Sequence, residues 1–245
     1  MPKFFFDESC IDGDCINIQG ETAHHIVNVL RYRVGDKVIF CNGNNIDYHT
    51  KLISFEKKKV VARLEVLKIK KTQTESPIFV CLFQSVIKWE NFDFAIQKSV
   101  EVGVGEIVPI VTERSIYKIS EVEKKTERFN RIAKSAAEQS MRGVIPKIKL
   151  PISFNEALVG KESTACFACC DEKKSLASFI EASSSNRIDI WIGPEGGFTD
   201  NEKKFLIENN IIPFTLGERV LRSETASIVS IAYTHLLFNC LPRSS

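Results

Sequence analysis

The stretch RIDIWIGPEGGFTDNE, residues 187–202, combines a short apolar strand, a glycine-rich turn and the start of a helix. Pro194 lacks an N–H and fixes its own φ, whereas Gly196 and Gly197 have no side chain and can adopt positive φ. Thr199 and the glutamate that ends the stretch have the spacing of a capping box, which begins a helix. A strand that passes through so short a turn into a helix indicates an α/β fold with a parallel sheet.

A second stretch, PFTLGERVLRSETA over residues 213–226, repeats this order. Gly217 follows a short strand, and Ser223 is placed to cap the last helix. The loop between them carries Val220 and Leu221, two apolar side chains that a solvated connector would not favour. We expect this pair to face inward against a ligand; the alternative is that it simply docks on the core.

The same alternation of strands and helices extends back to residue 78. Strands are predicted over 78–87, 106–111, 164–170, 187–192 and 213–216. Helices are predicted over 91–102, from Ser120 to Gly143, over 174–182, from Thr199 and over 223–239. This pattern predicts a parallel sheet with helices on both faces, in which ligands bind beyond the carboxyl ends of the strands. The turns at 193–197 and 217–222 lie at two such ends and can be either tight connectors or a binding site.

The first part of the chain reads differently. Short β-branched runs over 15–18, 37–41, 46–53 and 60–69 predict strands, and one helical patch lies at 23–31. Short strands with a single helix favour a small barrel. The polar stretch 70–77, which ends in proline, marks the expected boundary between two domains, 1–74 and 75–245.

Composition excludes several classes of protein. The 245 residues are 44% hydrophobic and 26% charged, with a net charge of +2. An RNA partner would therefore be held by local basic clusters and not by a global field. No apolar stretch approaches the ~20 residues of a membrane span, and the apolar run at the start is too short for a signal peptide. A cytoplasmic protein without membrane contact is expected.

The eight cysteines do not form a metal-binding pattern. Cys166 and Cys169 make a single CxxC, whereas a structural zinc site needs a second pair of Cys or His at similar spacing. No metal is expected. Reduced thiols packed on a strand are the favoured interpretation.

The chain also lacks the usual phosphate-binding and hydrolase motifs: GxxxxGK[ST], GxGxxG, HExxH and GxSxG are all absent. A ligand that carries adenosine without a phosphate chain would need backbone hydrogen bonds and an apolar slot. S-adenosyl-L-methionine fits this description.

Five motifs of the sequence resemble those of a known family. The motifs are HHIVNVLR, FAIQKSVEVGV, RIAKSAAEQSMRGVIP, IGPEGGFTDNE and LGERVLRSETA, in this order along nearly the whole chain. They resemble the RsmE family of 16S rRNA uridine-N3 methyltransferases, in the SPOUT (trefoil-knot) superfamily. The resemblance implies a PUA-like β-barrel for RNA at 1–74 and a SPOUT methyltransferase domain with a trefoil knot at 75–245. It also implies 16S rRNA or the small ribosomal subunit as substrate, and a homodimer to which the last helix contributes; complete burial of that helix within one chain is the alternative.

The resemblance also implies which residues form the site. The residues expected to hold S-adenosyl-L-methionine are Ala168, Cys169, Cys170, Ile192, Gly193, Pro194, Glu195, Gly196, Gly197, Leu216, Gly217, Val220 and Leu221. Arg222 is the candidate cation that stabilises charge developing on the uracil oxygens. Glu195 is a candidate base; its alternative role is a hydrogen bond that shapes its own loop.

Contacts to RNA are expected from scattered cations: Arg31, Arg33, Lys98, Arg114 and Arg142. Each can instead be a solvated surface charge. Two other functions remain open at this stage: a non-catalytic RNA-binding or ribosome-assembly protein, and a SPOUT methyltransferase that acts on another RNA.

Overall fold

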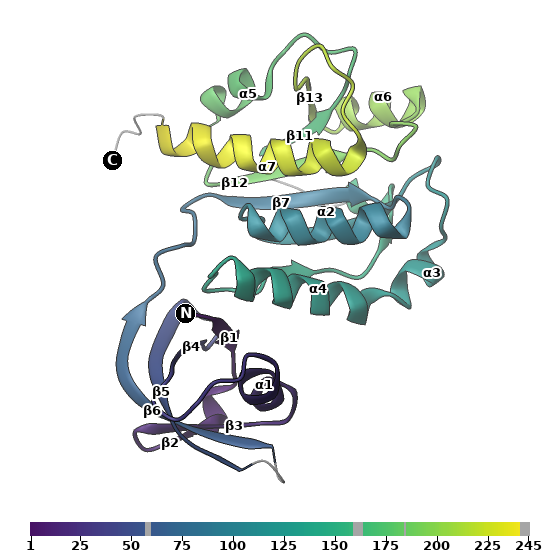
Figure 1. Ribbon diagram of the computed structural model, residues 1–245. Coiled ribbons are helices and arrows are strands. Elements are labelled where there is room, and N and C mark those ends of the chain that lie inside the picture. Colours follow the sequence, from purple (N-terminus) through teal and green to yellow (C-terminus); the bar gives the residue numbers. More distant parts are fainter. Residues whose placement is uncertain (57–59, 159–163, 184, 241–245) are drawn as a thin grey trace. The chain divides into compact units, whose positions relative to one another are not determined.

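The computed structural model describes residues 1–56, 60–158, 164–183 and 185–240 (Figure 1). The chain divides into two compact units. One contains Met1–Glu75 and Ala137–Ile145, and the other contains Ser76–Ala136 and Pro146–Ser245. The first unit thus includes a segment, 137–145, that lies beyond its expected boundary at residue 74.

The first unit is built around one mixed sheet. Its strands are β1 (Lys3–Phe5), β2 (Ile11–Asp12), β3 (Cys15–Gln19), β4 (Lys37–Cys41), β5 (Ile46–Glu56) and β6 (Val61–Lys71). They follow the order β1-β4-β5-β6-β3-β2, and only the β1–β4 pair among those described is parallel. The predicted helical patch is present as α1 (Gly20–His24) followed by a π-helical turn, His25–Val29. Alternate strand residues such as Ile16, Phe40 and Leu64 are fully buried and form the core with Ile26.

The segment 137–145 is bound to this unit through buried polar contacts. The Arg142 side chain forms an ion pair with Glu75 at 2.7 Å, and Glu75 also accepts the backbone N–H of Gly143 at 2.9 Å. Lys3 donates to the Met141 carbonyl at 3.1 Å and pairs with Asp47 at 2.7 Å. These contacts satisfy charges that burial alone would destabilise.

The second unit contains the parallel sheet that the sequence predicts. Its strands are β7 (Phe79–Ser85), β8 (Glu106–Val111), β9 (Lys147–Ile148), β10 (Ile152–Ser153), β11 (Thr164–Ala168), β12 (Arg187–Ile192) and β13 (Ile212–Phe214). Their order is β10-β8-β7-β12-β11-β13, with β9 also paired to β8. Every described pairing is parallel. The sequence therefore predicted the class of sheet correctly.

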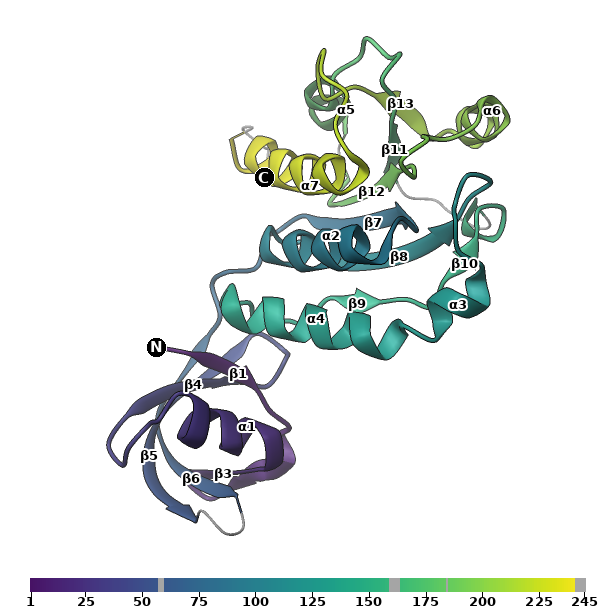
Figure 2. The same ribbon diagram turned by 45° about the vertical axis from the view of Figure 1, so that its right-hand side comes forward.

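Helices cover both faces of this sheet. They are α2 (Trp89–Glu101), α3 (Ile119–Glu123), α4 (Thr126–Gln139), α5 (Leu176–Ala182), α6 (Asp200–Glu208) and α7 (Ser223–Cys240). Figure 2 shows α2 and α7 on one face and α6 on the other. Successive residues of β7 point to opposite faces of the sheet. The Phe83 ring stacks on Trp191, with ring centroids 4.4 Å apart, in the core cluster that includes Leu206 of α6. The next residue, Gln84, instead donates a hydrogen bond to Ser223 of α7.

Two details of the helix prediction are wrong. The long helix expected from Ser120 is divided into α3 and α4, and α3 begins at Ile119 because the Glu121 carboxylate accepts the N–H of Lys118 at 2.8 Å. The helix also ends before Gly143, since Met141 takes the left-handed conformation with φ of 62°. The capping box at Thr199 is confirmed, with both reciprocal hydrogen bonds present.

Within the described ranges, no helix combines the length and the apolar character that crossing a membrane requires.

The buried pair of Glu75 and Arg142 predicts a pH-dependent stability. Burial alone raises the pKa of the Glu75 carboxyl, but the hydrogen bond and charge of Arg142, with neighbouring backbone N–H groups, lower it overall. Because the pKa is lowered by folding, the stabilisation is complete above the ordinary value of 4.5 and is lost as pH falls through the lowered value. Glu75→Gln leaves Arg142 buried without its partner and should cost about 3 kcal/mol in the free energy of unfolding.

Urea unfolding at neutral and acidic pH measures this effect. Glu65→Gln is the matched control, because its ion pair with Lys51 is exposed and worth about 0.5 kcal/mol. Equal losses in the two variants would contradict the prediction.

Candidate functional site

The parallel order brings several loops together at one edge of the sheet. The neighbours β7, β12, β11 and β13 run in the same direction, so their carboxyl ends share that edge. The chain leaves β7 outward to β8 on one side, and later continues from β12 to the other side through β13. Such a change of direction in the strand order is where open α/β sheets form ligand sites.

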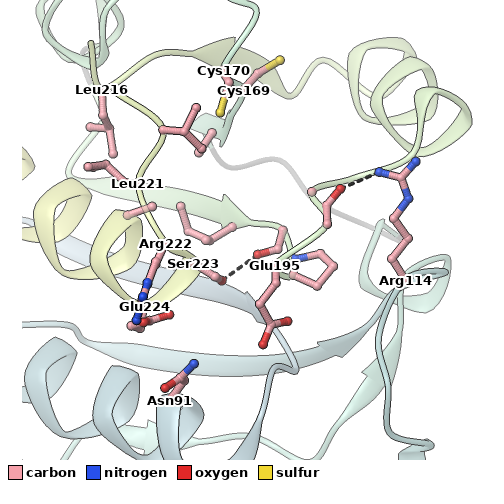
Figure 3. A pocket seen from close by; sticks show the side chains of 18 of the residues that line it. Asn91, Arg114, Cys169, Cys170, Glu195, Leu216, Leu221, Arg222, Ser223 and Glu224 are labelled. Carbon is pink, nitrogen blue, oxygen red and sulfur yellow. Dashed lines mark hydrogen bonds between the residues drawn. The ribbon is translucent and has the colours of Figure 1, made fainter. Parts of the chain in front are cut away.

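A cavity of about 800 Å³ lies at this edge (Figure 3). Its lining includes every residue predicted for the cofactor: Ala168, Cys169, Cys170, Ile192, Gly193, Pro194, Glu195, Gly196, Gly197, Leu216, Gly217, Val220 and Leu221. Arg222 and Arg114 line it too. The structure thus brings together three turns, residues 168–170, 193–197 and 216–222, that are separate in the sequence.

The glycine turn at 193–197 has a backbone that other residues would not adopt freely. A Cβ on Gly193 would lie 3.0 Å from the Phe198 nitrogen and 3.2 Å from the Gly197 Cα. Gly197 has φ of +68°, and its N–H donates to the Pro194 carbonyl at 2.8 Å. The turn is therefore tight, and its backbone borders the cavity without side chains at 193, 196 and 197.

A buried polar network holds this turn to the start of α7. The Ser223 hydroxyl donates to the Gly193 carbonyl at 2.7 Å (dashed in Figure 3) and accepts from the Gln84 amide at 3.0 Å. The Ser227 hydroxyl donates to the Gln84 amide oxygen. Gln84 and Ser227 are fully buried. The sequence predicted Ser223 as a helix cap, but its side chain instead joins the two cavity loops.

Two charged side chains also stabilise the turn. Glu195 accepts the backbone N–H of Lys88 at 3.3 Å, and the Arg114 guanidinium donates to the Gly196 carbonyl. These contacts favour the loop-shaping alternative for Glu195. Arg114, which was predicted to contact RNA, borders the cavity instead of lying apart from it.

The cysteines around the CxxC differ in environment. Cys166 is fully buried, and burial raises the pKa of its thiol well above the usual value, so it packs as a neutral side chain. Cys169 is half-buried, Cys170 is exposed, and both line the cavity. The expectation of buried thiols is right for Cys166 and wrong for Cys170.

The remaining RNA candidates lie in different surroundings. Arg31 and Arg33 line a second cavity of about 470 Å³ in the first unit, together with Tyr32. The Lys98 ammonium pairs with Glu101 at 2.8 Å and is partly neutralised.

The environment of Arg142 argues against the prediction that it contacts RNA. It is only 5% exposed and bound to Glu75. Its charge therefore serves the stability of the first unit.

Several lining residues were missed by the sequence analysis: Lys88, Asn91, Ile116, Phe214, Thr215, Arg219, Ser223, Glu224 and Ala226. Lys88 and Asn91 directly follow β7, so the rule that selected the other turns could have found them. Glu224 stands next to the serine that begins α7 and carried no signal of burial.

Comparisons with known proteins agree with this geometry. A family model described as an RNA methyltransferase domain matches residues 74–235, and one described as an RNA methyltransferase PUA domain matches residues 18–65. The chain is 35% identical over 229 residues to Ribosomal RNA small subunit methyltransferase E of Mesomycoplasma hyopneumoniae, covering 93% of this chain and 96% of that protein.

Two solved structures are similar over their whole length. The crystal structure of a Ribosomal RNA small subunit methyltransferase E from Neisseria gonorrhoeae, bound to S-adenosyl methionine, has a TM-score of 0.87 at 32% identity and covers 97% of this chain and 98% of that one. A putative methyltransferase from Legionella pneumophila, in complex with the same cofactor, has a TM-score of 0.86 at 27% identity, with 96% of each chain covered.

Fold and site define an α/β protein with a ligand cavity at the carboxyl edge of its parallel sheet, accompanied by a β-rich unit. The chain belongs to the RNA methyltransferase family, among the proteins called ribosomal RNA small subunit methyltransferase E. This confirms the family and the PUA-like domain that the motifs indicated. The trefoil knot stays a prediction.

Two glycines of the turn, Gly193 and Gly196, should respond differently to an added methyl group. Gly193→Ala places Cβ against backbone atoms that cannot move aside and should destabilise the protein by about 1–3 kcal/mol. Gly196→Ala meets only the flexible Arg114 side chain, at 3.2 Å, and should change stability by less than about 0.5 kcal/mol. Thermal unfolding of both variants measures the difference, and a Gly196→Ala variant as unstable as Gly193→Ala would contradict this geometry.

Proposed function

We propose that this protein transfers a methyl group from S-adenosyl-L-methionine to N3 of a specific uridine in the 16S rRNA of the small ribosomal subunit. The observation that carries the proposal is the single cavity formed by the three turns at the carboxyl edge of the parallel sheet. The names of the relatives, which are small-subunit rRNA methyltransferases, support the reaction and the class of substrate. The N3 position follows from the likeness to the RsmE family.

The residues of the cavity suit this cofactor. A volume of about 800 Å³ is within the range for a nucleoside-sized ligand. Gly193 and Gly196 leave backbone uncovered, while Leu216, Val220 and Leu221 supply apolar contacts. The chain has no phosphate-binding loop motif, in keeping with a ligand that carries no phosphate chain. The neighbours solved with S-adenosylmethionine support the assignment.

The two parts of the chain receive separate roles in this proposal. Residues 1–74 form the RNA-binding domain, and residues 75–245 carry out methyl transfer. The match of the PUA model to 18–65 and of the methyltransferase model to 74–235 supports this division. Arg31, Arg33 and Lys98 remain the RNA-contact candidates outside the cavity, and Arg114 is one beside it.

The reaction demands placement and charge stabilisation. The bound cofactor supplies a methyl group on a positively charged sulfur. The turns that line the cavity hold it still, and orientation of this kind contributes much of the rate of an in-line transfer. Arg222 is exposed on the cavity wall, where its guanidinium stabilises negative charge on a uracil oxygen as the N3 proton leaves.

Homodimer formation is part of the proposal. The outer side of α7 exposes Val229, Tyr233 and Leu236 by 39%, 40% and 62%, and Phe94 of the adjacent α2 is 47% exposed. By contrast Ile231 is fully buried in the monomer. A second copy of the chain would cover the exposed apolar side chains of both helices.

Two other functions are separated from this one by direct tests. A non-catalytic RNA-binding protein would give no heat with S-adenosyl-L-methionine in calorimetry. A methyltransferase of another RNA would bind the cofactor and leave 16S rRNA unmodified. Mass mapping of 16S rRNA after incubation with the purified protein and cofactor should locate one N3-methylated uridine.

Arg222→Ala should abolish methylation while binding of the cofactor remains. Loss of one group that stabilises transition-state charge lowers the rate by about 10²–10³-fold. Calorimetry and single-turnover methylation measure the two effects. Lys204→Ala, which removes an exposed cation of α6 away from the cavity, is the control and should keep wild-type activity. Full activity of Arg222→Ala would exclude its assigned role.

Arg31→Gln should weaken binding to RNA and reduce its dependence on salt. Each phosphate contact that is lost lowers the slope of log affinity against log salt by about 1. Filter binding to 16S rRNA at several salt concentrations measures this slope. Lys51→Gln removes a cation already paired with Glu65 and serves as control. An unchanged slope for Arg31→Gln would remove it from the RNA surface.

A further inference from the structure

Glu224 is buried in the wall of the cavity without a complete set of partners. It is the second residue of α7 and is 7% exposed. Among the described residues, its Oε2 oxygen is buried and has no hydrogen-bond partner. A buried polar oxygen left without a hydrogen-bond partner costs about 1–3 kcal/mol, so this side chain lowers the stability of the protein unless a ligand supplies the missing partner. An unsatisfied buried oxygen in the wall of a ligand cavity is therefore a candidate for contact with a substrate.

Glu195, the only other carboxylate among the described cavity-lining residues, has a structural role. It is exposed and accepts the backbone N–H of Lys88. An exposed carboxylate used to fix a loop is poorly placed to take a proton from a bound base. The geometry therefore separates the two acids: Glu195 shapes the turn, and Glu224 has an oxygen free for a substrate.

A purely structural reason for Glu224 accounts for its position but not for its burial. A carboxylate in the first turn of a helix interacts favourably with the helix dipole. This interaction is available to an exposed side chain, and it needs no inward orientation. Figure 3 places Glu224 at the end of the cavity where Arg222, just before α7, and Asn91 of α2 also lie.

We infer that Glu224 is the proton acceptor of the reaction proposed above, on which this inference rests. The N3–H of uracil donates its proton to the carboxylate of Glu224. The electron pair left on N3 forms the new bond to the methyl carbon, while the methyl–sulfur bond breaks with its electrons remaining on sulfur. The protonated carboxyl then releases its proton to water, so that one proton leaves for each methyl group transferred.

Glu224 also accounts for the selection of uracil over cytosine as the nucleobase that is methylated. The Watson–Crick edge of uracil presents a donor, N3–H, between two carbonyl acceptors. A carboxylate at Glu224 complements the central donor, and the donors of Arg222 and Asn91 complement the carbonyls. Cytosine has no proton at N3, so its N3 acceptor would face the carboxylate and be rejected.

Glu224→Gln tests the inference, because it keeps the shape of the side chain and removes the basic oxygen. Its single-turnover rate on 16S rRNA should fall by about 10²–10⁴-fold at neutral pH. The wild-type rate should be level across neutral and mildly alkaline pH, whereas the variant's rate should rise about tenfold per pH unit, since only uracil ionised by solvent can then react. Calorimetry should show that the variant binds S-adenosyl-L-methionine within about threefold of wild type.

Glu208→Gln, which changes an exposed carboxylate of α6 outside the cavity, is the matched control and should keep the wild-type rate and pH profile. Glu224→Asp retains a carboxylate and should keep that profile at a lower plateau, which carries the test should the glutamine variant not fold. The inference is overturned by a Glu224→Gln variant with the wild-type rate and profile. It is equally overturned by loss of cofactor binding in that variant, which would make Glu224 a cofactor ligand. Failure of the wild-type protein to bind cofactor or modify 16S rRNA would instead refute the proposed function itself.

Discussion

The hydrogen bond from Ser223 to the carbonyl of Gly193 is the interaction on which the cavity depends. It joins the turn after β12 to the first residue of α7. The fully buried Gln84 of β7 donates a second hydrogen bond to the same serine hydroxyl. A buried carbonyl or amide without a partner costs about 1–3 kcal/mol, so these groups hold one another in place. One side chain from the centre of the sheet thereby sets the relative position of two loops that come from distant parts of the sequence.

The turn after β12 needs glycine at two positions, for two different reasons. Gly193 approaches the backbone of Phe198 so closely that a Cβ would collide, and Gly197 has a left-handed φ. Both are demands of local geometry. The same tight path leaves the backbone uncovered where it borders the cavity. A tight turn and a bare cavity wall, which are alternatives when only the sequence is considered, are two results of one conformation.

The sequence predicted most of the residues that line the cavity, because its position follows from a general property of parallel sheets. Apolar strands identify their own ends, and the turns beyond those ends share one edge. The prediction failed for polar residues that tertiary packing buries. Arg142 resembles any surface cation in the sequence, but its pairing with Glu75 places it in the interior of the first unit. Glu224 resembles an ordinary first-turn acid, and only the packing of α7 shows that its carboxylate is enclosed.

The strand order also lies beyond what periodicity can tell. Alternating strands and helices indicate a parallel sheet, yet many orders satisfy the pattern, and the position of β12 between β7 and β11 depends on long-range packing. The start of α3 is a smaller example, since a hydrogen bond from the backbone of Lys118 to Glu121 moves the helix start away from the capping box that the sequence favours at Ser120.

In the mechanism proposed above, burial separates the electrostatic tasks of two charged residues, one just before α7 and one in its first turn. Arg222 is exposed, so its long side chain can reorient when a substrate arrives, and its charge stays hydrated until then. Glu224, two residues later, is held inside the wall. A proton acceptor gains from a fixed position, because transfer requires hydrogen-bond distance at the moment of reaction, whereas a stabilising cation acts over a longer range. The buried Ser223 between them is hydrogen-bonded to Gly193, which ties this part of the chain to the turn after β12.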